Sequence, residues 1–216
     1  MKKFEQELAT VKRRVMEMGA LAARMVALAS DALVKRDAMI VAQVLEAEEE
    51  LDRFQITIDS EAIRLITIYA PTARHLRFLL MVARISTELE RIGDQAVNNC
   101  EYVQMFPSDP PPKARDDLSR MTAITIEMMH GALQAFEHED VLKAKQVVTR
   151  DDEVDALNRQ TFEDLLGDRT GHRDDIKLSM SLILLARSLE RIADHAVNVC
   201  EEVVFLVEGE DIRHQT

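Results

Sequence analysis

Four pairs of acidic residues stand four positions apart in the sequence. Because an α-helix turns once in 3.6 residues, each pair would place both carboxylates on one helical face. Carboxylates that converge must take up protons, stay solvated or hold a cation. An oxygen-only set of ligands suits hard or borderline ions such as Mg²⁺, Mn²⁺, Ca²⁺ or iron. The pairs are Glu48 and Asp52, Glu90 and Asp94, Asp151 and Asp155, and Glu190 and Asp194.

Two of these pairs lie in a segment that occurs twice in the chain. Residues 89–101 and 189–201 are identical at ten of thirteen positions. The two copies share further polar residues on the acidic face, which are candidate outer ligands or hydrogen-bond partners of the first ligands. These residues are Asn98 and Glu101 in the first copy, and Asn198 and Glu201 in the second.

The other two pairs interrupt apolar helical seams. Glu48 lies between Val44 and Leu51, and Asp151 holds the corresponding place 103 residues later. A bundle ordinarily places apolar residues at such positions. Like charges at this spacing also repel by about 0.2–0.5 kcal/mol. A solvated helix surface would explain any single pair, but four pairs at corresponding places favour a role in gathering cations.

The elements that must position these acids are helices. Good helix formers dominate the composition, whereas there are six Gly residues and no Trp. From Phe4 to about Val34, apolar residues recur in steps of three and four, which predicts a long amphipathic helix. A second helix is expected after Asp37, a plausible N-cap. Pro71 should break it, and a third helix is expected over residues 73–106.

The same pattern restarts after the proline-rich residues 107–112. A shorter second break at 167–172 explains why the offset between the copies falls from 103 to 100. The sequence therefore predicts an all-α protein of two pseudo-symmetric antiparallel three-helix bundles, with six long helices. The predicted domains are residues 1–107 and 108–216, and the last helix should end near Gly209, before a frayed tail.

Charge and hydropathy exclude several classes of function. The net charge of −12 would repel a phosphate backbone, so we expect no nucleic-acid partner. The start of the chain has no apolar core like that of a signal peptide, and no apolar stretch is long enough to span a bilayer. We therefore expect a cytoplasmic protein.

No arrangement of residues indicates an enzyme. Nucleotide-binding glycine motifs and Ser/His or Cys/His nucleophile patterns are absent from the sequence. Cys100 and Cys200 are expected to be free thiols, because a reducing cytoplasm disfavours a disulfide. His75, His172 and His195 are not spaced as a metal triad and are interpreted as polar surface or helix-end residues.

The duplicated segment, the acidic pairs and residues 71–77 (PTARHLR) together resemble the PhoU family over almost the whole chain. The resemblance implies two three-helix bundles whose eight paired acids bind metal clusters, with iron, zinc or other ions. It also implies a cytoplasmic negative regulator of phosphate uptake and of phosphate-starvation signalling. Such a regulator would contact the ATPase of a phosphate ABC transporter and a membrane-bound sensor histidine kinase, would often be a homodimer, and would reach the membrane only through these partners.

Two positions depart from the family pattern. His75 stands where members usually have Asp, which questions any role of a carboxylate there. Ala193 replaces the Gly expected between Ile192 and Asp194, and we interpret it as a packing change. Neither departure touches the four acidic pairs.

Two alternatives to a metal-binding regulatory adaptor stay open at this point. One is a carboxylate-bridged metalloenzyme, a hydrolase or redox enzyme in which the same cluster activates water or oxygen. The other is a structural interaction module whose acidic faces hold no ion. Turnover abolished by substitution of the acids would favour the first, and a melting temperature indifferent to metal would favour the second.

Overall fold

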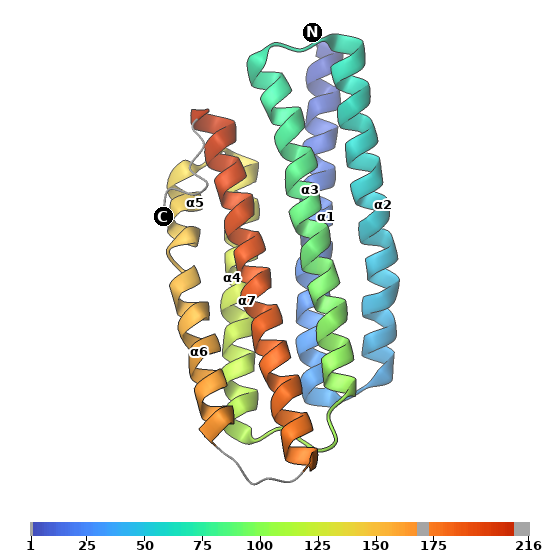
Figure 1. The fold of residues 1–216 in the computed structure, drawn as a ribbon. Helices are drawn as coiled ribbons and strands as arrows, with labels where there is room; N and C mark the ends of the chain where they lie inside the picture. The colour runs from blue at the N-terminus through green and yellow to red at the C-terminus, as the bar shows by residue number, and fades with distance from the viewer. Residues whose placement is uncertain (1, 168–172, 210–216) are drawn as a thin grey trace.

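The computed structural model describes residues 2–167 and 173–209, which fold into helices joined by short loops (Figure 1). The predicted all-α class is confirmed. Residues 168–172 and 210–216, which hold most of the predicted second break and the predicted tail, lie outside the described residues. The helices are α1 (Lys2–Lys35), α2 (Ala38–Tyr69), α3 (Ala73–Gln104), α4 (Pro112–His138), α5 (Val141–Val148), α6 (Asp151–Gly167) and α7 (Arg173–Glu208).

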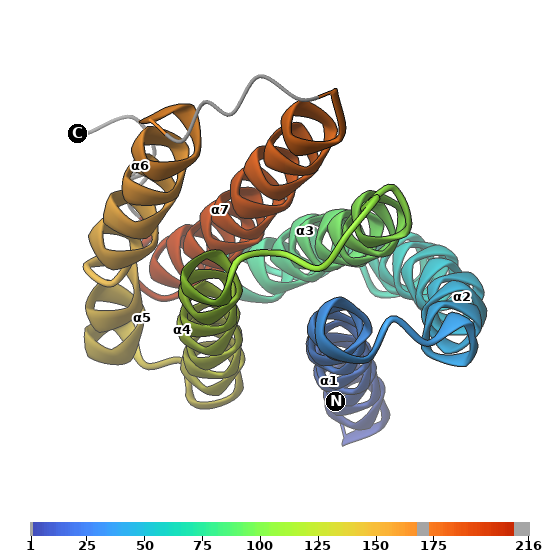
Figure 2. The ribbon, with the colours of Figure 1, turned by 90° about the horizontal axis from the view of Figure 1, so that it is seen from below.

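Two three-helix repeats lie side by side, as predicted. The first consists of α1, α2 and α3, and the second of α4, the α5/α6 pair and α7. Seen from one end, α2, α3, α7 and α6 lie in a row, and α1 and α4 lie on one side of it (Figure 2). The antiparallel pair α3 and α7 forms the centre of the row and joins the repeats.

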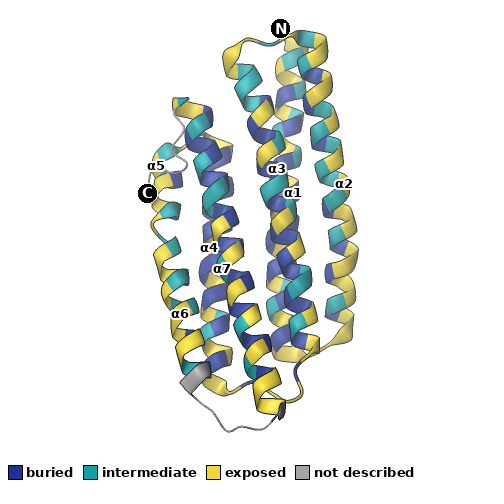
Figure 3. Cartoon of the chain, in the orientation of Figure 1, coloured by how far each residue is buried: buried dark blue, intermediate teal, exposed yellow. Residues whose placement is uncertain are grey.

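The apolar seams face the interior of the molecule. Each helix buries one side and exposes the other, as the dark and light stripes of Figure 3 show. The seam predicted for α1 is buried along its length, apart from Phe4, which packs against the core from its edge. The buried members of that seam are Leu8, Val11, Val15, Met18, Ala22, Met25, Ala29 and Ala32.

Local signals in the sequence set several helix ends. The Asp37 side chain accepts a hydrogen bond from the amide of Met39 at 2.8 Å and caps α2 as predicted. At the corresponding place, Asp140 accepts from the amide of Lys143 at 3.0 Å. α2 ends where Ala70 adopts a left-handed conformation with φ of 41°, immediately before Pro71.

The middle helix of the second repeat is interrupted, unlike α2. α5 ends at Val148, and α6 begins at Asp151. The hydroxyl of Thr149 donates to the carbonyl of Gln146 at 2.9 Å, a local bond of the kind that competes with regular helix. The sequence patterns did not predict this break, which places Asp151 in the first turn of a new helix.

Close packing of α2 on α3 depends on Gly93. A Cβ atom at Gly93 would lie 2.2 Å from Cδ2 of Leu51, a side chain that is 1% exposed. The second repeat has Ala193 at the position of Gly93 and the smaller Val154 at the position of Leu51. The methyl group that Ala193 adds is therefore matched by the methylene that Val154 lacks relative to Leu51. This supports the interpretation of Ala193 as a packing change.

Gly93→Ala is expected to destabilise the metal-free protein by about 1–2 kcal/mol. Overpacking of this kind costs about 1–3 kcal/mol, and the better helix propensity of Ala offsets part of it. Combining it with Leu51→Val should lower the cost below the sum of the two single substitutions. Urea unfolding of the four proteins in a double-mutant cycle measures the coupling, and strictly additive effects would contradict the packing explanation.

Both cysteines are free, as predicted, and both are buried. Burial, with a smaller contribution from the neighbouring glutamate, raises the pKa of the Cys100 thiol to about 11 and that of Cys200 to about 12. Neither side chain therefore offers a thiolate near neutral pH. Among the described helices, none has the length and apolar character needed to cross a membrane.

Candidate metal centres

The first acidic cluster lies between α2 and α3. Glu48 and Asp52 come from α2, and Glu90 and Asp94 come from α3. Burial, followed by repulsion from Asp52 and Asp94, raises the pKa of Glu48. Burial, followed by repulsion from Asp94 and Asp52, raises the pKa of Glu90. The four carboxylates are thus close enough to repel one another across the two helices.

The second cluster has the same construction between α6 and α7. Asp151 and Asp155 lie in the first two turns of α6, opposite Glu190 and Asp194 of α7. Burial, and then repulsion from Asp194, Asp155 and Glu190, raises the pKa of Asp151 to about 6. Partial removal of the carboxylate from solvent, and then repulsion from Asp155, also raises the pKa of Asp194, although the residue as a whole is exposed. The eight predicted acids therefore form two sets of four, and each set is divided between two neighbouring helices.

The chemistry of both clusters fits an oxygen-ligated cation. Oδ1 of Asp151 is buried and has no hydrogen-bond partner, which is costly for a carboxylate unless a cation or a proton compensates it. As the side chains stand, no three His, Cys, Asp or Glu residues in the described parts are grouped tightly enough to hold a metal ion. Asp94 and Asp194 are exposed and so have room to turn inward. Their role as ligands stays a prediction.

The candidate outer residues are not equivalent in the two repeats. Asn98 lies one helical turn beyond Asp94 and is half-buried, and Glu101 is exposed. Asn198 is engaged elsewhere, because its amide donates to Oε2 of Glu88 at 2.8 Å. Glu201 is half-buried in the last third of α7. The part of these four residues in a metal site also stays a prediction.

A buried polar cluster lies between the two acidic clusters and was missed by sequence reasoning. Oε2 of Glu88 on α3 lies 2.8 Å from Nδ1 of His195 on α7, and it also accepts from Asn198. Burial alone would raise the pKa of Glu88, but hydrogen bonds from His195 and Asn198, with the charges of His195 and Arg91, lower it below its ordinary value. Glu88 is therefore held as a carboxylate in the α3–α7 interface.

The prediction that His195 is a surface or helix-end residue is wrong. It is 9% exposed and lies in the interior of α7. The two positions that pair here, 88 and 195, have counterparts at 188 and 95, where the Ser188 hydroxyl donates to Oε1 of Gln95 at 3.1 Å. The sequence did carry a signal for this contact, because the two copies differ at both positions: Glu88 corresponds to Ser188, and His195 to Gln95. His75 does lie in the first turn of α3, and His172 is outside the described residues.

Comparisons with known proteins match the whole two-repeat chain. The PhoU domain family model matches residues 15–103 and 118–203, so each match contains one acidic cluster. A phosphate-specific transport system accessory protein PhoU homolog from Aquifex aeolicus (strain VF5) is 35% identical over 213 residues, covering 99% of this chain and 96% of that protein.

Solved structures agree with this match. The crystal structure of PhoU from Pseudomonas aeruginosa superimposes with a TM-score of 0.90 at 29% identity, covering 96% of this chain and 100% of that one. The phosphate transport system regulatory protein PhoU from Streptococcus pneumoniae gives a TM-score of 0.89 over 97% of this chain and 99% of that one. At 22% identity, the second comparison supports the fold alone.

Proposed function

Because the chain belongs to the PhoU family, we propose that it is an accessory protein that regulates a phosphate-specific transport system. The observation that carries this proposal is the match of the family model to both repeats. The Aquifex aeolicus relative extends over nearly the same length, so the likeness covers the whole architecture. The accessory-protein names of the relatives favour an adaptor over a carboxylate-bridged metalloenzyme.

The finer proposal is negative regulation in the cytoplasm. The protein would restrain phosphate uptake and phosphate-starvation signalling by contacting the transporter ATPase and a sensor histidine kinase, as a homodimer that reaches the membrane only through these partners. Exposed apolar side chains support docking of partners. Ile56 and Ile63 lie on one face of α2, two turns apart, and are 65% and 66% exposed.

Each acidic cluster would hold oxygen-ligated cations, with iron, zinc, manganese or magnesium as candidates. A bound cation would neutralise the converging carboxylates and give each surface a defined charge. Burial, together with repulsion from neighbouring carboxylates, raises the pKa of Glu48 and of Asp151. This supports the proposal, because it makes the empty cluster unfavourable near neutral pH. Glu88 would hold α3 and α7 at a set position through His195, and so keep the two clusters in register.

The combined substitution of Glu90→Gln and Asp94→Asn tests both parts of the proposal. It removes the α3 half of the first cluster without changing side-chain size. Elemental analysis of the purified protein should show loss of the metal held by the first cluster, about half of the total if the clusters are equivalent. In cells that lack the chain, phosphate uptake should rise, and the variant should restrain it less than the natural sequence does.

The matched control is Glu46→Gln with Glu50→Gln. This pair has the same spacing on α2 but is fully on the exposed side of the helix. The control should retain its metal and its regulation of uptake. Unchanged metal content in the Glu90 and Asp94 variant would show that the ligands are wrongly assigned, whereas normal uptake in cells lacking the chain would contradict the regulatory role itself.

A further inference from the structure

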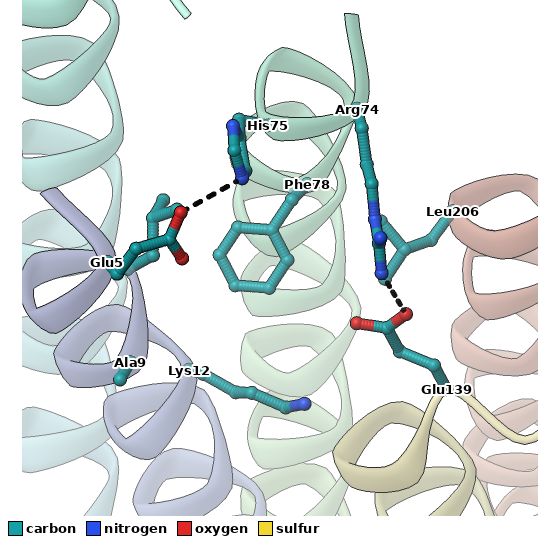
Figure 4. A pocket seen from close by; sticks show the side chains of 9 residues that line it. Glu5, Ala9, Lys12, Arg74, His75, Phe78, Glu139 and Leu206 are labelled. Atoms are coloured by element: carbon teal, nitrogen blue, oxygen red, sulfur yellow. Dashed lines mark hydrogen bonds and ion pairs between the residues drawn. The ribbon is translucent and has the colours of Figure 1, made fainter. Parts of the chain in front are cut away.

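A cleft of about 400 Å³ opens at the end of the molecule where the two repeats meet (Figure 4). α1 and the first turns of α3 form one side of it, and residues next to α4 and within α7 form the other. Its volume lies within the range of about 300–1,000 Å³ that is usual for sites of small ligands. Arg74 in its wall precedes Glu90 by sixteen residues, or about 24 Å along α3, so the cleft is separate from the acidic clusters.

Two ion pairs line the cleft, and Lys12 is a further cation in its wall. Nε2 of His75 lies 3.5 Å from Glu5, and the Arg74 guanidinium lies 3.1 Å from Glu139. Lys12 projects between these pairs in Figure 4. Within the described residues it has no carboxylate partner.

Lys12 lies near an aromatic ring. Its ammonium group lies 5.8 Å from the centre of the Phe136 ring, at the outer limit of a cation–π contact. That contact leaves the three N–H donors of the ammonium group free of any acceptor among the described residues. Lys12 can therefore donate to a ligand without first giving up a salt bridge.

Arg77 is not part of the lining, but it contacts a residue that is. Its Nε donates to the carbonyl of Leu206, which lines the cleft, and no carboxylate of the described residues pairs with it. Lys12 in the lining and Arg77 beside Leu206 are thus two positive charges that no carboxylate of the described residues pairs with. In a chain with a net charge of −12, a local excess of cations marks a place where an anion can approach.

The floor of the cleft is apolar. Phe78 lies between the two ion pairs in Figure 4, and its ring stacks on that of Phe136 with centroids 6.3 Å apart and planes 10° from parallel. Leu8 and Leu206 lie beside it and are largely buried. A rigid aromatic floor of this kind favours a ligand with an apolar body and not a simple inorganic ion.

We propose that this cleft binds a small organic anion in which a phosphate or carboxylate group is joined to an apolar body. The Lys12 ammonium group donates to the anionic group, and Arg74 supplies further N–H donors, because Glu139 uses only part of its guanidinium. The apolar body packs on Phe78. Such a ligand touches α1 and α3 on one side and α7 on the other, so its binding acts on the junction of the two repeats.

Calorimetric titration with phenyl phosphate tests the proposal on the full chain. Metal is first removed with a chelator, so the result does not depend on the acidic clusters. Phenyl phosphate should bind saturably at one site, at least about tenfold more tightly than inorganic phosphate or phenol alone. Lys12→Gln should weaken its binding about tenfold or more, equivalent to about 1.4 kcal/mol at 25 °C.

The control is Lys177→Gln, which removes the same charge from an exposed position in the first turns of α7, at the opposite end of the molecule. It should bind phenyl phosphate like the natural sequence, and circular dichroism should show both variants folded. Three results would overturn the proposal: no saturable binding of phenyl phosphate, equal binding by the two variants, or binding of inorganic phosphate as tight as that of phenyl phosphate.

Discussion

Asp151→Asn is expected to stabilise the metal-free protein by about 1–2 kcal/mol at pH 7.5. Burial and the carboxylates of Asp194, Asp155 and Glu190 raise the pKa of Asp151 from 3.8 to about 6. This rise in the pKa corresponds to about 3 kcal/mol, which solvent screening of the partly exposed side chain reduces to about 1–2 kcal/mol. Asn keeps the shape of the side chain and removes the charge.

The effect should depend on pH in a defined direction. A carboxyl group whose pKa is raised by folding binds its proton more tightly in the folded state, so its cost is absent below the unfolded pKa of 3.8. The cost grows as the pH rises and is complete above about pH 6. The free energy of unfolding of the two proteins should therefore agree near pH 3.5 and separate between pH 4 and 6, as measured by urea unfolding at each pH.

Metal should reverse the order of stability. A cation that binds only the folded state raises the melting temperature of the natural sequence, and Asp151→Asn removes one of its ligands. The variant should thus be the more stable protein with chelator and gain less from added metal. If the substitution raises stability with chelator but lowers it with added metal, Asp151 is a metal ligand and not merely a strained residue.

Asp152→Asn provides the matched control for this prediction. Asp152 follows Asp151 in the first turn of α6 and loses the same charge on substitution, but its side chain is exposed. It should change stability by less than about 0.5 kcal/mol and leave the response to metal intact. If the two variants behave alike, the effect of Asp151 comes from the helix end and not from the cluster.

The fold was predictable because its signals are local. The seam of α1, the cap at Asp37 and the break before Pro71 each depend on residues within a few positions of one another. The acidic pairs share this property, since spacing of four residues decides which face of a helix they occupy. Their approach across two helices followed from the antiparallel repeat, which the duplication indicated.

The features that were missed depend on pairing between distant residues. Glu88 and His195 are 107 positions apart in the sequence. Considered within its own helix, each is an ordinary polar residue. Only the position of α3 relative to α7 shows that they meet. The interruption at Thr149 was missed for another reason, because the apolar seam continues through it from Val147 to Val154 without a Gly or Pro.

Glu88→Ala is expected to destabilise the protein by about 2–4 kcal/mol. The side chains of Glu88 and His195 are 13% and 11% exposed, and the variant leaves buried N–H donors of His195 and Asn198 without their acceptor. Because the pKa of Glu88 is lowered in the folded state, its contribution is complete above the ordinary value of 4.5 and is lost as the pH falls through the folded value. Urea unfolding at pH 7.5 and at more acid pH measures both effects.

Ser188→Ala at the corresponding position of the second repeat is the internal control. It removes one hydroxyl bond to Gln95 in the same interface, so it should cost only about 0.5–1.5 kcal/mol and show no comparable dependence on acid pH. Glu88→Gln, which keeps one acceptor oxygen but no charge, should fall between the two. An equal loss from Ser188→Ala and Glu88→Ala would mean that the interface is held by apolar packing alone, and the two acidic clusters would then have no ionic connection through α3 and α7.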